Sequence, residues 1–392
     1  MSQAVDLRAP GAPRRYRSLP LPSVLRLGVE RFRNAPPALA VRAVIGLRRF
    51  LHRLADALTP ADLVVFERST GLAETALLGA VARHDLVDLL EERGPLDAAA
   101  IAVARGLDAD AVHRTLRALA AMGVFVMHDD GRFSNNRISR ALRSGTVERS
   151  REWALYFSSG SNATAWLDLA RTLETGESAF KRVHGMNVWE WFDAHPDERE
   201  MFAHCMMGIS ALHAPAIASL YPFEEVKRLC DVGGGRGTLL GEILLRHPHI
   251  QGVLCDGAGV VESARELLTA RGVADRVELR PGSFFEEVPS GCDAYLLKNV
   301  LHDWDDATCK QILRVVRAAM TPGQRLIVCE IVVDRLSRES QGTRVDLQMM
   351  IACDQGRERS ADEIRALLSE CGFRFTRAFP YPIVSVFEAE AT

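Results

Sequence analysis

A glycine-rich turn near the middle of the chain restricts the fold more than any other feature. Residues 229–240 read Leu-Cys-Asp-Val-Gly-Gly-Gly-Arg-Gly-Thr-Leu-Leu, which predicts a buried strand, a tight turn and the start of an amphipathic helix. A second apolar run, residues 250–254, is followed closely by Asp256. Together these segments predict a βαβ unit whose second strand ends in a carboxylate, the place where a ribose diol is commonly bound. We therefore expect a nucleoside-type ligand at this edge of an α/β sheet.

The spacing of the glycines favours one class of cofactor. The dinucleotide fingerprint G-x-G-x-x-G fits poorly, because its last position, counted from Gly233, is Thr238. Instead, Gly233, Gly235 and Gly237 fall at every second residue after the acidic Asp231. Without Cβ atoms they let the backbone turn sharply beside a ligand. This spacing resembles the S-adenosylmethionine (SAM) site of class I methyltransferases.

Composition narrows the class of protein. A chain of 392 residues with 47% hydrophobic content is long enough for two domains, and a net charge of −3 gives no general reason to expect nucleic acid or membrane binding. The eight cysteines form no C-x-x-C pair, so we expect reduced core residues in a cytoplasmic protein without a bound metal. The sequence shows no signal peptide and no uninterrupted apolar run of 18 residues.

Residues 1–60 are predicted to be an arginine-rich N-terminal extension. Residues 1–53 hold eleven Arg, no Lys and two acidic residues, a local balance of +9. From residue 37 to residue 58, apolar and basic residues alternate at helical spacing, which predicts a basic amphipathic helix. Such a helix could cover a neighbouring domain or a dimer partner, or make peripheral contact with an anionic membrane. We do not expect it to bind nucleic acid.

Residues 61–145 are predicted to form a small, mainly helical domain closed by a hairpin. Residues 96–104 and 110–122 give a helix-turn-helix pattern, and a wing-like hairpin follows around the Asp-Gly turn at residues 130–131. A winged helix can bind DNA. The second helix, however, carries only three basic residues, so we expect the domain to form a homodimer.

The rest of the chain divides into a helical region and a sheet. Residues 146–225 are predicted to be helical, and their many aromatic residues suit a pocket for a flat, apolar substrate. Residues 226–392 alternate strands and helices, which predicts a doubly wound α/β domain. The expected strands are 228–232, 250–255, 276–280, 293–298, 324–331, 373–378 and 383–388. The expected helices are 237–247, 259–271, 305–319 and 360–371. The last two strands have no helix between them and should pair antiparallel at one sheet edge.

A polar cluster follows one of these strands. Residues 295–306 read Tyr-Leu-Leu-Lys-Asn-Val-Leu-His-Asp-Trp-Asp-Asp, so a buried strand leads directly to His302. Ligands of open α/β sheets bind at the carboxyl ends of the strands. An ordinary histidine pKa near ~6.5 suits a general base. Glu330, at the end of the next strand, and Glu358 could both accept a hydrogen bond from one ring nitrogen and leave the other free.

These segments together resemble a known family. Residues 229–372 are similar to the plant-type O-methyltransferases, SAM-dependent enzymes of phenylpropanoid and bacterial aromatic-polyketide pathways. The segments that carry the resemblance are 231–237, 282–285, 297–304 and 356–360. Residues 73–225 resemble the family's winged dimerisation domain and linking helices. The resemblance implies a Rossmann-like sheet with an antiparallel edge strand behind an N-terminal winged-helix dimerisation domain.

The resemblance also implies roles for individual residues. The catalytic residues would be His302 as the base, with Glu330 and Glu358 beside it. The residues that bind SAM, or its product S-adenosylhomocysteine, would be Ser210, Asp231, Gly233, Gly235, Gly237, Asp256, Ser283, Phe284, Lys298 and Trp304. The residues that line the pocket of a small-molecule substrate would be Trp153, Phe157, Met206, Met349 and Cys353.

Two departures from the family pattern keep a second function open. Ser283 stands where the family usually has an aspartate that accepts the adenine amino group, and a hydroxyl loses about 1 kcal/mol of charge-assisted bonding. Residues 257–259, Gly-Ala-Gly, replace the usual Leu-Pro. The first expectation is an O-methyltransferase of secondary metabolism. The alternative is a methyltransferase fold that carries out hydroxylation, decarboxylation or a pericyclic step, and a DNA-binding regulator is a third.

Overall fold

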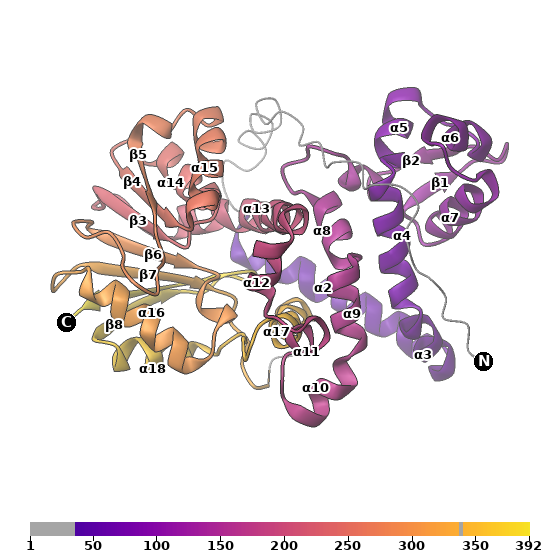
Figure 1. Ribbon diagram of the computed structural model, residues 1–392. Coiled ribbons are helices and arrows are strands. Elements are labelled where there is room, and N and C mark those ends of the chain that lie inside the picture. The colour runs from indigo at the N-terminus through magenta and orange to yellow at the C-terminus, as the bar shows by residue number, and fades with distance from the viewer. Residues whose placement is uncertain (1–35, 337–339) are drawn as a thin grey trace.

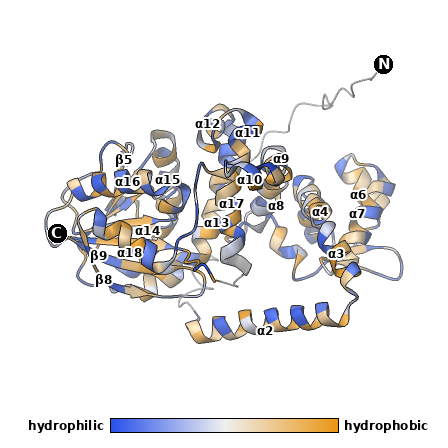
Figure 2. Cartoon of the chain, turned by 90° about the horizontal axis from the view of Figure 1, so that it is seen from below, coloured by the Kyte–Doolittle hydropathy of each residue, from blue (hydrophilic) through white to orange (hydrophobic). Residues whose placement is uncertain are grey.

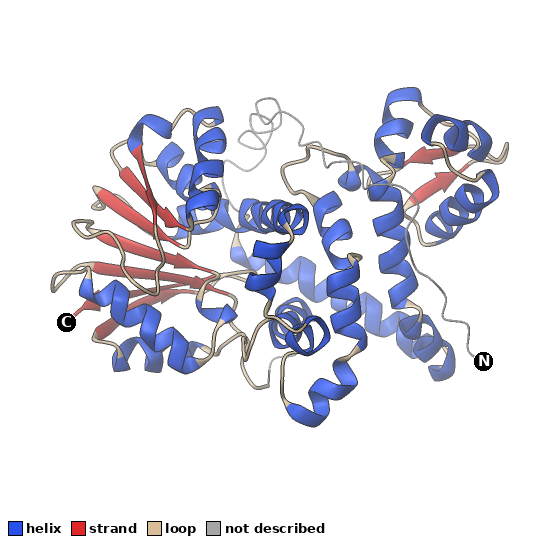
Figure 3. Cartoon of the chain, viewed as in Figure 1, coloured by secondary structure: helices blue, strands red, loops and turns tan. Residues whose placement is uncertain are grey.

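The computed structural model describes residues 36–336 and 340–392, and within them three regions follow one another along the chain. A small domain with a short hairpin lies at one end of the molecule, a bundle of helices lies in the middle, and a seven-stranded sheet lies at the other end (Figures 1 and 3). The arginine-rich segment before residue 36 lies outside the described residues.

The small domain contains short helices and one hairpin. Its elements are α3 (Ala61–Ser69), α4 (Gly71–Arg83), α5 (Leu86–Arg93), α6 (Ala98–Arg105), α7 (Ala109–Ala121), β1 (Phe125–Met127), β2 (Phe133–Asn135) and η1 (Ser139–Leu142). Helices α6 and α7 begin at Asp97 and Asp108, whose carboxylates accept hydrogen bonds from the third backbone N–H that follows. The antiparallel β1–β2 pair follows α7 directly, as the winged-helix prediction requires. Helix α2 (Ala38–Leu58) precedes this domain.

The middle region is helical throughout. It contains α8 (Ser150–Phe157), α9 (Gly160–Leu167), α10 (Leu169–Thr175), α11 (Ala179–His184), α12 (Val188–Ala194) and α13 (Pro196–Leu220). Helix α17 (Ser340–Ala352) packs against α9 and α11, although it comes from the last third of the chain. By length and composition α13 is able to cross a membrane, but 56% of its most apolar window is buried inside the molecule, as in a core helix.

The sheet has the order β5-β4-β3-β6-β7-β9-β8. Its strands are β3 (Arg228–Val232), β4 (Gln251–Asp256), β5 (Val277–Pro281), β6 (Ala294–Lys298), β7 (Arg325–Glu330), β8 (Phe373–Phe379) and β9 (Ser385–Ala391). The connecting elements are α14 (Thr238–Arg246), α15 (Ala258–Ala270), η2 (Ala274–Arg276), η3 (Leu301–Asp303), α16 (Asp306–Ala318) and α18 (Ala361–Glu370). Strands β3 to β7 are parallel, and β9 pairs antiparallel with both β7 and β8.

Alternation along the central strands builds a core on each face of the sheet. On β6, Tyr295 and Leu297 pack in the cluster that holds α16 and α18, whereas Leu296 packs in the cluster that holds α14 and α15. Side chains of a strand point alternately to the two faces, so a fully apolar strand needs helices on both sides. The parallel strands consequently end together at one edge, next to the middle helices.

The structure confirms the predicted fold class and places each predicted strand within a few residues. The expected antiparallel pair β8–β9 closes one edge of the sheet. Helix α17 was not predicted, because its first half is polar and contains Gly342, so no apolar period is visible there. The eight cysteines are buried free thiols. The predicted domain boundaries at residues 60, 145 and 225 stay predictions.

Candidate active site

The glycine turn between β3 and α14 takes a conformation that few other residues adopt. Gly233, Gly235 and Gly237 have φ of 68°, 58° and 75°. This left-handed region favours glycine because a Cβ atom would clash with the backbone. A Cβ atom on Gly233 would also lie 2.9 Å from Cγ2 of Val300. A Cβ atom on Gly235 would meet nothing within 4 Å, so the turn is open at its tip.

The carboxylate of Asp256, at the end of β4, holds this turn in place. Its Oδ2 accepts a hydrogen bond from the backbone N–H of Gly235 at 2.8 Å, and its Oδ1 accepts one from Gly257 at 2.7 Å. Burial raises the pKa of Asp256, while these two N–H donors act to lower it. Each carboxylate oxygen has further acceptor capacity. Asp256 can therefore orient the turn and still accept hydrogen bonds from a ribose.

A buried aspartate and a partly buried lysine lie behind the turn. Lys298, the last residue of β6, donates a hydrogen bond to Oγ of Ser210 on α13 at 2.9 Å. Burial lowers the pKa of Lys298 to about 8 and raises the pKa of Asp231 to about 7. Oδ2 of Asp231 is buried without a hydrogen-bond partner in the described part of the chain. The predicted residues Ser210, Asp231 and Lys298 thus lie together beside the turn, and Asp231 is the most buried of the three.

Aromatic rings form the side of the turn. The nearest ring atom of Phe284 would lie 3.4 Å from a Cβ atom on Gly233, so this ring lies next to the first glycine. Phe285 packs between Phe284 and Trp304, with ring centroids 4.8 Å and 4.9 Å away. The Oγ of Ser283 accepts a hydrogen bond from the backbone N–H of Phe285 at 3.3 Å. A flat base would have an apolar ring on one side and a hydroxyl at its edge.

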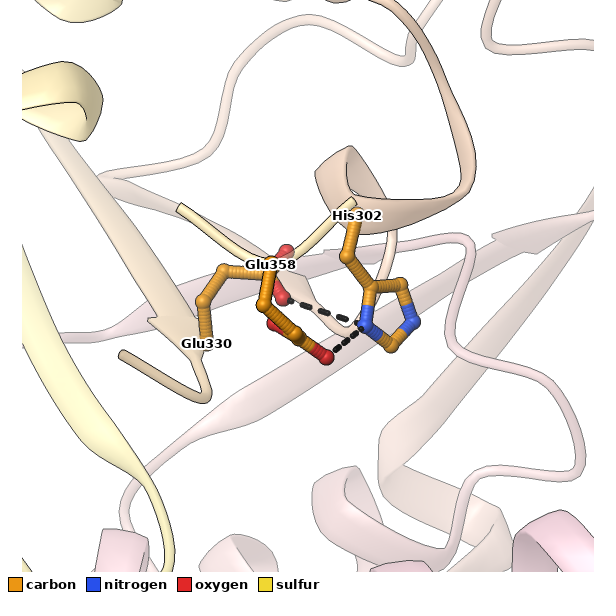
Figure 4. A group of neighbouring side chains, drawn as sticks. All are labelled: His302, Glu330 and Glu358. Atoms are coloured by element: carbon orange, nitrogen blue, oxygen red, sulfur yellow. Dashed lines mark hydrogen bonds and ion pairs between the residues drawn. The ribbon is translucent and has the colours of Figure 1, made fainter. Parts of the chain in front are cut away.

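His302 lies on η3, just beyond the end of β6, and two glutamates face one of its ring nitrogens (Figure 4). Glu358 accepts a hydrogen bond from Nδ1 at 2.8 Å, as predicted. Glu330 lies 3.8 Å from the same nitrogen, beyond hydrogen-bonding distance. Its Oε1 instead accepts the backbone N–H groups of Val300 and Leu301, at 3.2 and 3.0 Å. The prediction of a second hydrogen bond was therefore wrong, because Glu330 holds the backbone that carries His302.

Sequence reasoning missed a third carboxylate at this site. Oδ1 of Asp303 lies 3.5 Å from Nε2 of His302 and 3.7 Å from Sγ of Cys353. Burial raises the pKa of Asp303 to about 6. Its position directly after His302 was the only available signal, and that adjacency does not show to which side the carboxylate turns. Asp303 faces the ring nitrogen that both glutamates leave free.

These carboxylates control the charge of the imidazole. Burial alone acts to lower the pKa of His302. The carboxylates of Glu358, Asp303 and Glu330 act in the opposite direction and together raise this pKa to about 10. Burial in turn raises the pKa of Glu330 to about 7. A proton on the imidazole is therefore strongly favoured while the carboxylates are ionised.

His302, Glu330 and Glu358 could offer ligand atoms to a metal, since one atom of each lies within 4.8 Å of the others. The distance between Nδ1 of His302 and the carboxylate of Glu358 favours a proton, rather than a metal ion, between these two groups. A tetrahedral zinc ion, bound at about 2.0–2.2 Å by each ligand, would hold Nδ1 and a carboxylate oxygen about 3.4 Å apart. The observed separation of 2.8 Å is that of a hydrogen bond.

Arg359 fixes the loop that carries His302, and sequence reasoning did not single it out. Its guanidinium is buried and donates to the backbone carbonyls of Leu301 and Trp304, each at 2.7 Å. It also donates to Asp306 at 2.8 and 3.0 Å. Because Arg359 follows Glu358 in the chain, one short segment both holds the loop and supplies the hydrogen bond to the imidazole.

The predicted substrate residues mostly gather on the far side of His302. Trp153, Met206 and Met349 are partly buried against a cluster that contains Tyr156 and Cys353. Trp153 also donates a hydrogen bond from Nε1 to the carbonyl of Cys205 at 3.2 Å. Trp304 stacks on Trp189 of α12, with centroids 6.1 Å apart, and joins this cluster to the cofactor side. Phe157, at the end of α8, touches the ring of Tyr156 edge-on, with centroids 5.5 Å apart, but 40% of its surface is exposed.

Comparison with known proteins identifies the family. A family model described as an O-methyltransferase domain matches residues 166–374, and one described as an O-methyltransferase dimerisation domain matches residues 66–145. A mitomycin biosynthesis 6-O-methyltransferase from Streptomyces lavendulae is 39% identical over 296 residues, 75% of this chain and 83% of that protein. An 8-amino-8-demethylriboflavin N,N-dimethyltransferase from Streptomyces davaonensis is 31% identical over 320 residues, 81% of this chain and 91% of that protein.

A solved structure supports the same relationship. It is that of NcsB1, an O-methyltransferase from neocarzinostatin biosynthesis, in complex with SAM and 2-hydroxy-5-methyl naphthoic acid. It has a TM-score of 0.71 and 30% sequence identity, and covers 82% of this chain and 96% of its own. From the two matched domains and these relatives, we conclude that the chain belongs to the O-methyltransferase family.

Proposed function

We propose that the chain transfers a methyl group from SAM to a hydroxyl of an aromatic or largely apolar small molecule, with His302 as the general base. The observation that carries this proposal is the position of the imidazole. Its Nδ1 is fixed to Glu358 at 2.8 Å, while Nε2 points away from both glutamates (Figure 4). Val300, two residues earlier, lies against Gly233 of the glycine turn. The base is thus built next to the predicted cofactor edge.

The residues at this edge suit SAM. The turn is open at Gly235, Asp256 can accept the ribose hydroxyls, and the ring of Phe284 can pack on the adenine. The buried acidic group behind the turn, Asp231, has an oxygen atom without a partner and suits a ligand with a positive charge. When bound, SAM would supply an electrophilic methyl group that needs no further activation by the protein.

The work left for this chain is to orient the acceptor and remove its proton. Nε2 of His302 accepts the hydroxyl proton as the oxygen becomes methylated, and the imidazolium that forms is stabilised through Nδ1–H by Glu358. Asp303 lies 3.5 Å from Nε2 and can accept a hydrogen bond from a second donor on the acceptor. The proton then leaves to solvent when the products are released.

A base must be neutral before it accepts a proton, and the pKa of about 10 describes His302 without ligands. Two effects act to lower this pKa in the loaded site. A bound sulfonium adds a positive charge nearby, and a proton on Glu330 or Asp303 removes a negative one. Because burial raises the pKa of Glu330 to about 7 and of Asp303 to about 6, such a proton is available near neutral pH.

The proposed acceptor follows from the pocket beyond His302. The substrate pocket that we propose there would be formed by the cluster of tryptophan, tyrosine and methionine side chains, which fit a flat ring and adapt to its outline. NcsB1 was solved with a hydroxylated naphthoic acid, an acceptor of this kind. The N,N-dimethyltransferase relative modifies nitrogen, and an amine acceptor is therefore the second candidate.

Release of S-adenosylhomocysteine tests the proposal. The protein is incubated with SAM and, in parallel, with phenols, hydroxynaphthoates and anilines, and products are identified by mass spectrometry. A methyl group on oxygen of a phenolic acceptor is expected. Methylation of anilines alone would replace the first candidate with the second. Binding of SAM with conversion of an acceptor but without S-adenosylhomocysteine would point to a methyltransferase fold used for another reaction.

A further inference from the structure

Helix α2 presents a wide apolar surface that no described part of the chain covers. This leucine face consists of Leu39, Val44, Leu47, Phe50, Leu51, Leu54 and Leu58. Their side chains are between 45% and 80% exposed. From Val44 onward a member of this set recurs every three or four residues, and all seven lie on one side of the helix. A single chain rarely exposes a continuous apolar surface of this extent without a partner.

The opposite side of α2 faces the molecule. Val41, Ile45 and Arg49, spaced four residues apart, are partly buried, whereas the leucine face is exposed. The helix is attached at both ends. Tyr381 donates a hydrogen bond to the carbonyl of Pro36 at 2.9 Å, and Arg68 of α3 bonds to Asp56 at 2.6 Å. Figure 2 shows α2 as a separate rod along one edge of the molecule. The leucine face therefore points away from the molecule.

Arginines border the leucine face on both sides. Arg48 lies along one border, and Arg42 and Arg53 lie along the other. All three side chains are exposed, and none has an ion pair with a residue in the described ranges. From residue 36 to residue 55 the chain has no acidic residue, and Asp56 is already bonded to Arg68. The helix thus combines a broad apolar face with uncompensated guanidinium groups, which bind phosphate well.

We propose that α2 is a peripheral membrane helix whose leucine face inserts into the headgroup region of an anionic phospholipid bilayer. A leucine- and phenylalanine-rich face bordered by arginine is the composition of helices that lie in this interface. Each arginine near an anionic surface strengthens binding by about fivefold. The helix would hold the enzyme beside the lipid phase, in which apolar acceptors concentrate.

A second copy of the chain fits these observations less well. The family's dimerisation domain begins at residue 66, after α2 has ended. Helix α2 therefore lies outside the matched dimerisation segment. Residues 1–53 alone carry a charge of +9, so a second copy that packed its own leucine face on this one would bring arginines against arginines. Charge therefore favours a phospholipid surface as the occupant.

Vesicle flotation with the full chain tests the proposal. The vesicles are phosphatidylcholine alone, and phosphatidylcholine mixed with phosphatidylglycerol. We expect binding to the anionic vesicles, weakened by salt at about 1 M, where screening is nearly complete. The variant Arg42→Gln/Arg48→Gln/Arg53→Gln should bind about 100-fold more weakly. The variant Leu47→Gln/Phe50→Gln/Leu54→Gln, which keeps the charge, should lose binding altogether.

Two measurements separate this proposal from its alternatives. The control variant Leu167→Gln/Leu173→Gln changes exposed apolar residues elsewhere and should bind vesicles like the wild type. Sedimentation of each variant gives the oligomeric state, and methylation of a water-soluble acceptor, which does not depend on the vesicles, should be unchanged. The proposal is overturned if the wild type fails to bind anionic vesicles, or if the leucine-face variant binds them as well as the wild type does. A leucine-face variant that becomes monomeric while wild-type vesicle binding is absent would identify a second copy as the occupant.

Discussion

Replacing Glu358 with glutamine should separate the chemistry of the site from cofactor binding. Glutamine keeps the shape of the side chain and can still accept a hydrogen bond from Nδ1 of His302, now 2.8 Å from Oε1, but it removes the negative charge. A hydrogen bond to a charged group contributes about 1.5–3 kcal/mol. In Glu358→Gln, the imidazolium that forms during proton removal no longer has a charged hydrogen-bond partner. We therefore expect kcat to fall by about 10- to 100-fold.

The same substitution should shift the pH dependence of kcat/KM in a defined direction. Among the carboxylates, Glu358 does most to raise the pKa of His302 to about 10. Removing that charge lowers the pKa, so the rising limb of kcat/KM with pH should move to lower pH in Glu358→Gln. The affinity for S-adenosylhomocysteine, measured by calorimetry, should stay within about twofold of wild type. The matched control is Glu370→Gln, an exposed residue on α18 that pairs with Lys310. A kcat close to that of wild type, or an unmoved limb, would refute the role of Glu358.

Three further substitutions probe the cofactor edge. Gly233 has φ 68°, and a Cβ atom there would lie 2.9 Å from Val300. Gly233→Ala should therefore lower the free energy of unfolding by about 1–3 kcal/mol in thermal melts. The control Gly257→Ala adds a Cβ atom in open space and should not lower it. Ser283→Asp should strengthen SAM binding by up to about tenfold in calorimetry, and Ser283→Asn should not. Burial raises the pKa of Asp231 to about 7, so between about pH 4 and 7 this side chain binds a proton in the folded chain that it does not bind in the unfolded chain. The contribution of Asp231 to stability therefore falls as the pH rises through this range. Asp231→Asn should reduce that fall by up to about 1.4 kcal/mol per pH unit in denaturant titrations, and an unchanged pH dependence would contradict it.

The fold could be predicted largely because its signals are local. Each central strand is a segment of five or six residues with an apolar centre, and the glycines of residues 233–237 mark the first turn. Their positive φ angles bear out the reason for expecting glycine there. The antiparallel β8–β9 pair followed from the absence of a helix between two strands. Helix α17 escaped notice because it is stabilised by α9 and α11 rather than by a period in its own sequence.

The site was predictable only in part, since its residues meet through loops. The ends of β6 and β7 bring His302 and Glu330 together, and this followed from the order of the strands. The hydrogen bonds did not follow, because Glu330 binds the backbone N–H groups of Val300 and Leu301 instead of the imidazole. Arg359 was missed for a similar reason. The partners through which it holds the His302 loop are two backbone carbonyls, which leave no mark in a sequence.

For the extension before residue 60, the helix could be predicted from the sequence but its orientation could not. The amphipathic period of α2 was visible, and the helix forms where the period begins and ends. The sequence could not show which side would face the molecule. The hydrogen bonds from Tyr381 to Pro36 and from Arg68 to Asp56 help to set which side faces the molecule. Tyr381 lies far from α2 in the chain, and Arg68 lies on a separate helix.

The most direct test of the central claim is the turnover of His302→Ala at two values of pH, with saturating SAM and a phenolic acceptor. If His302 removes the acceptor's proton, the variant should lose at least about 100-fold in kcat near pH 7. The loss should shrink near pH 10, where a phenol ionises without help. Binding of S-adenosylhomocysteine should be nearly unchanged. A variant that turns over normally near pH 7, or whose loss is the same at both values of pH, would contradict the account.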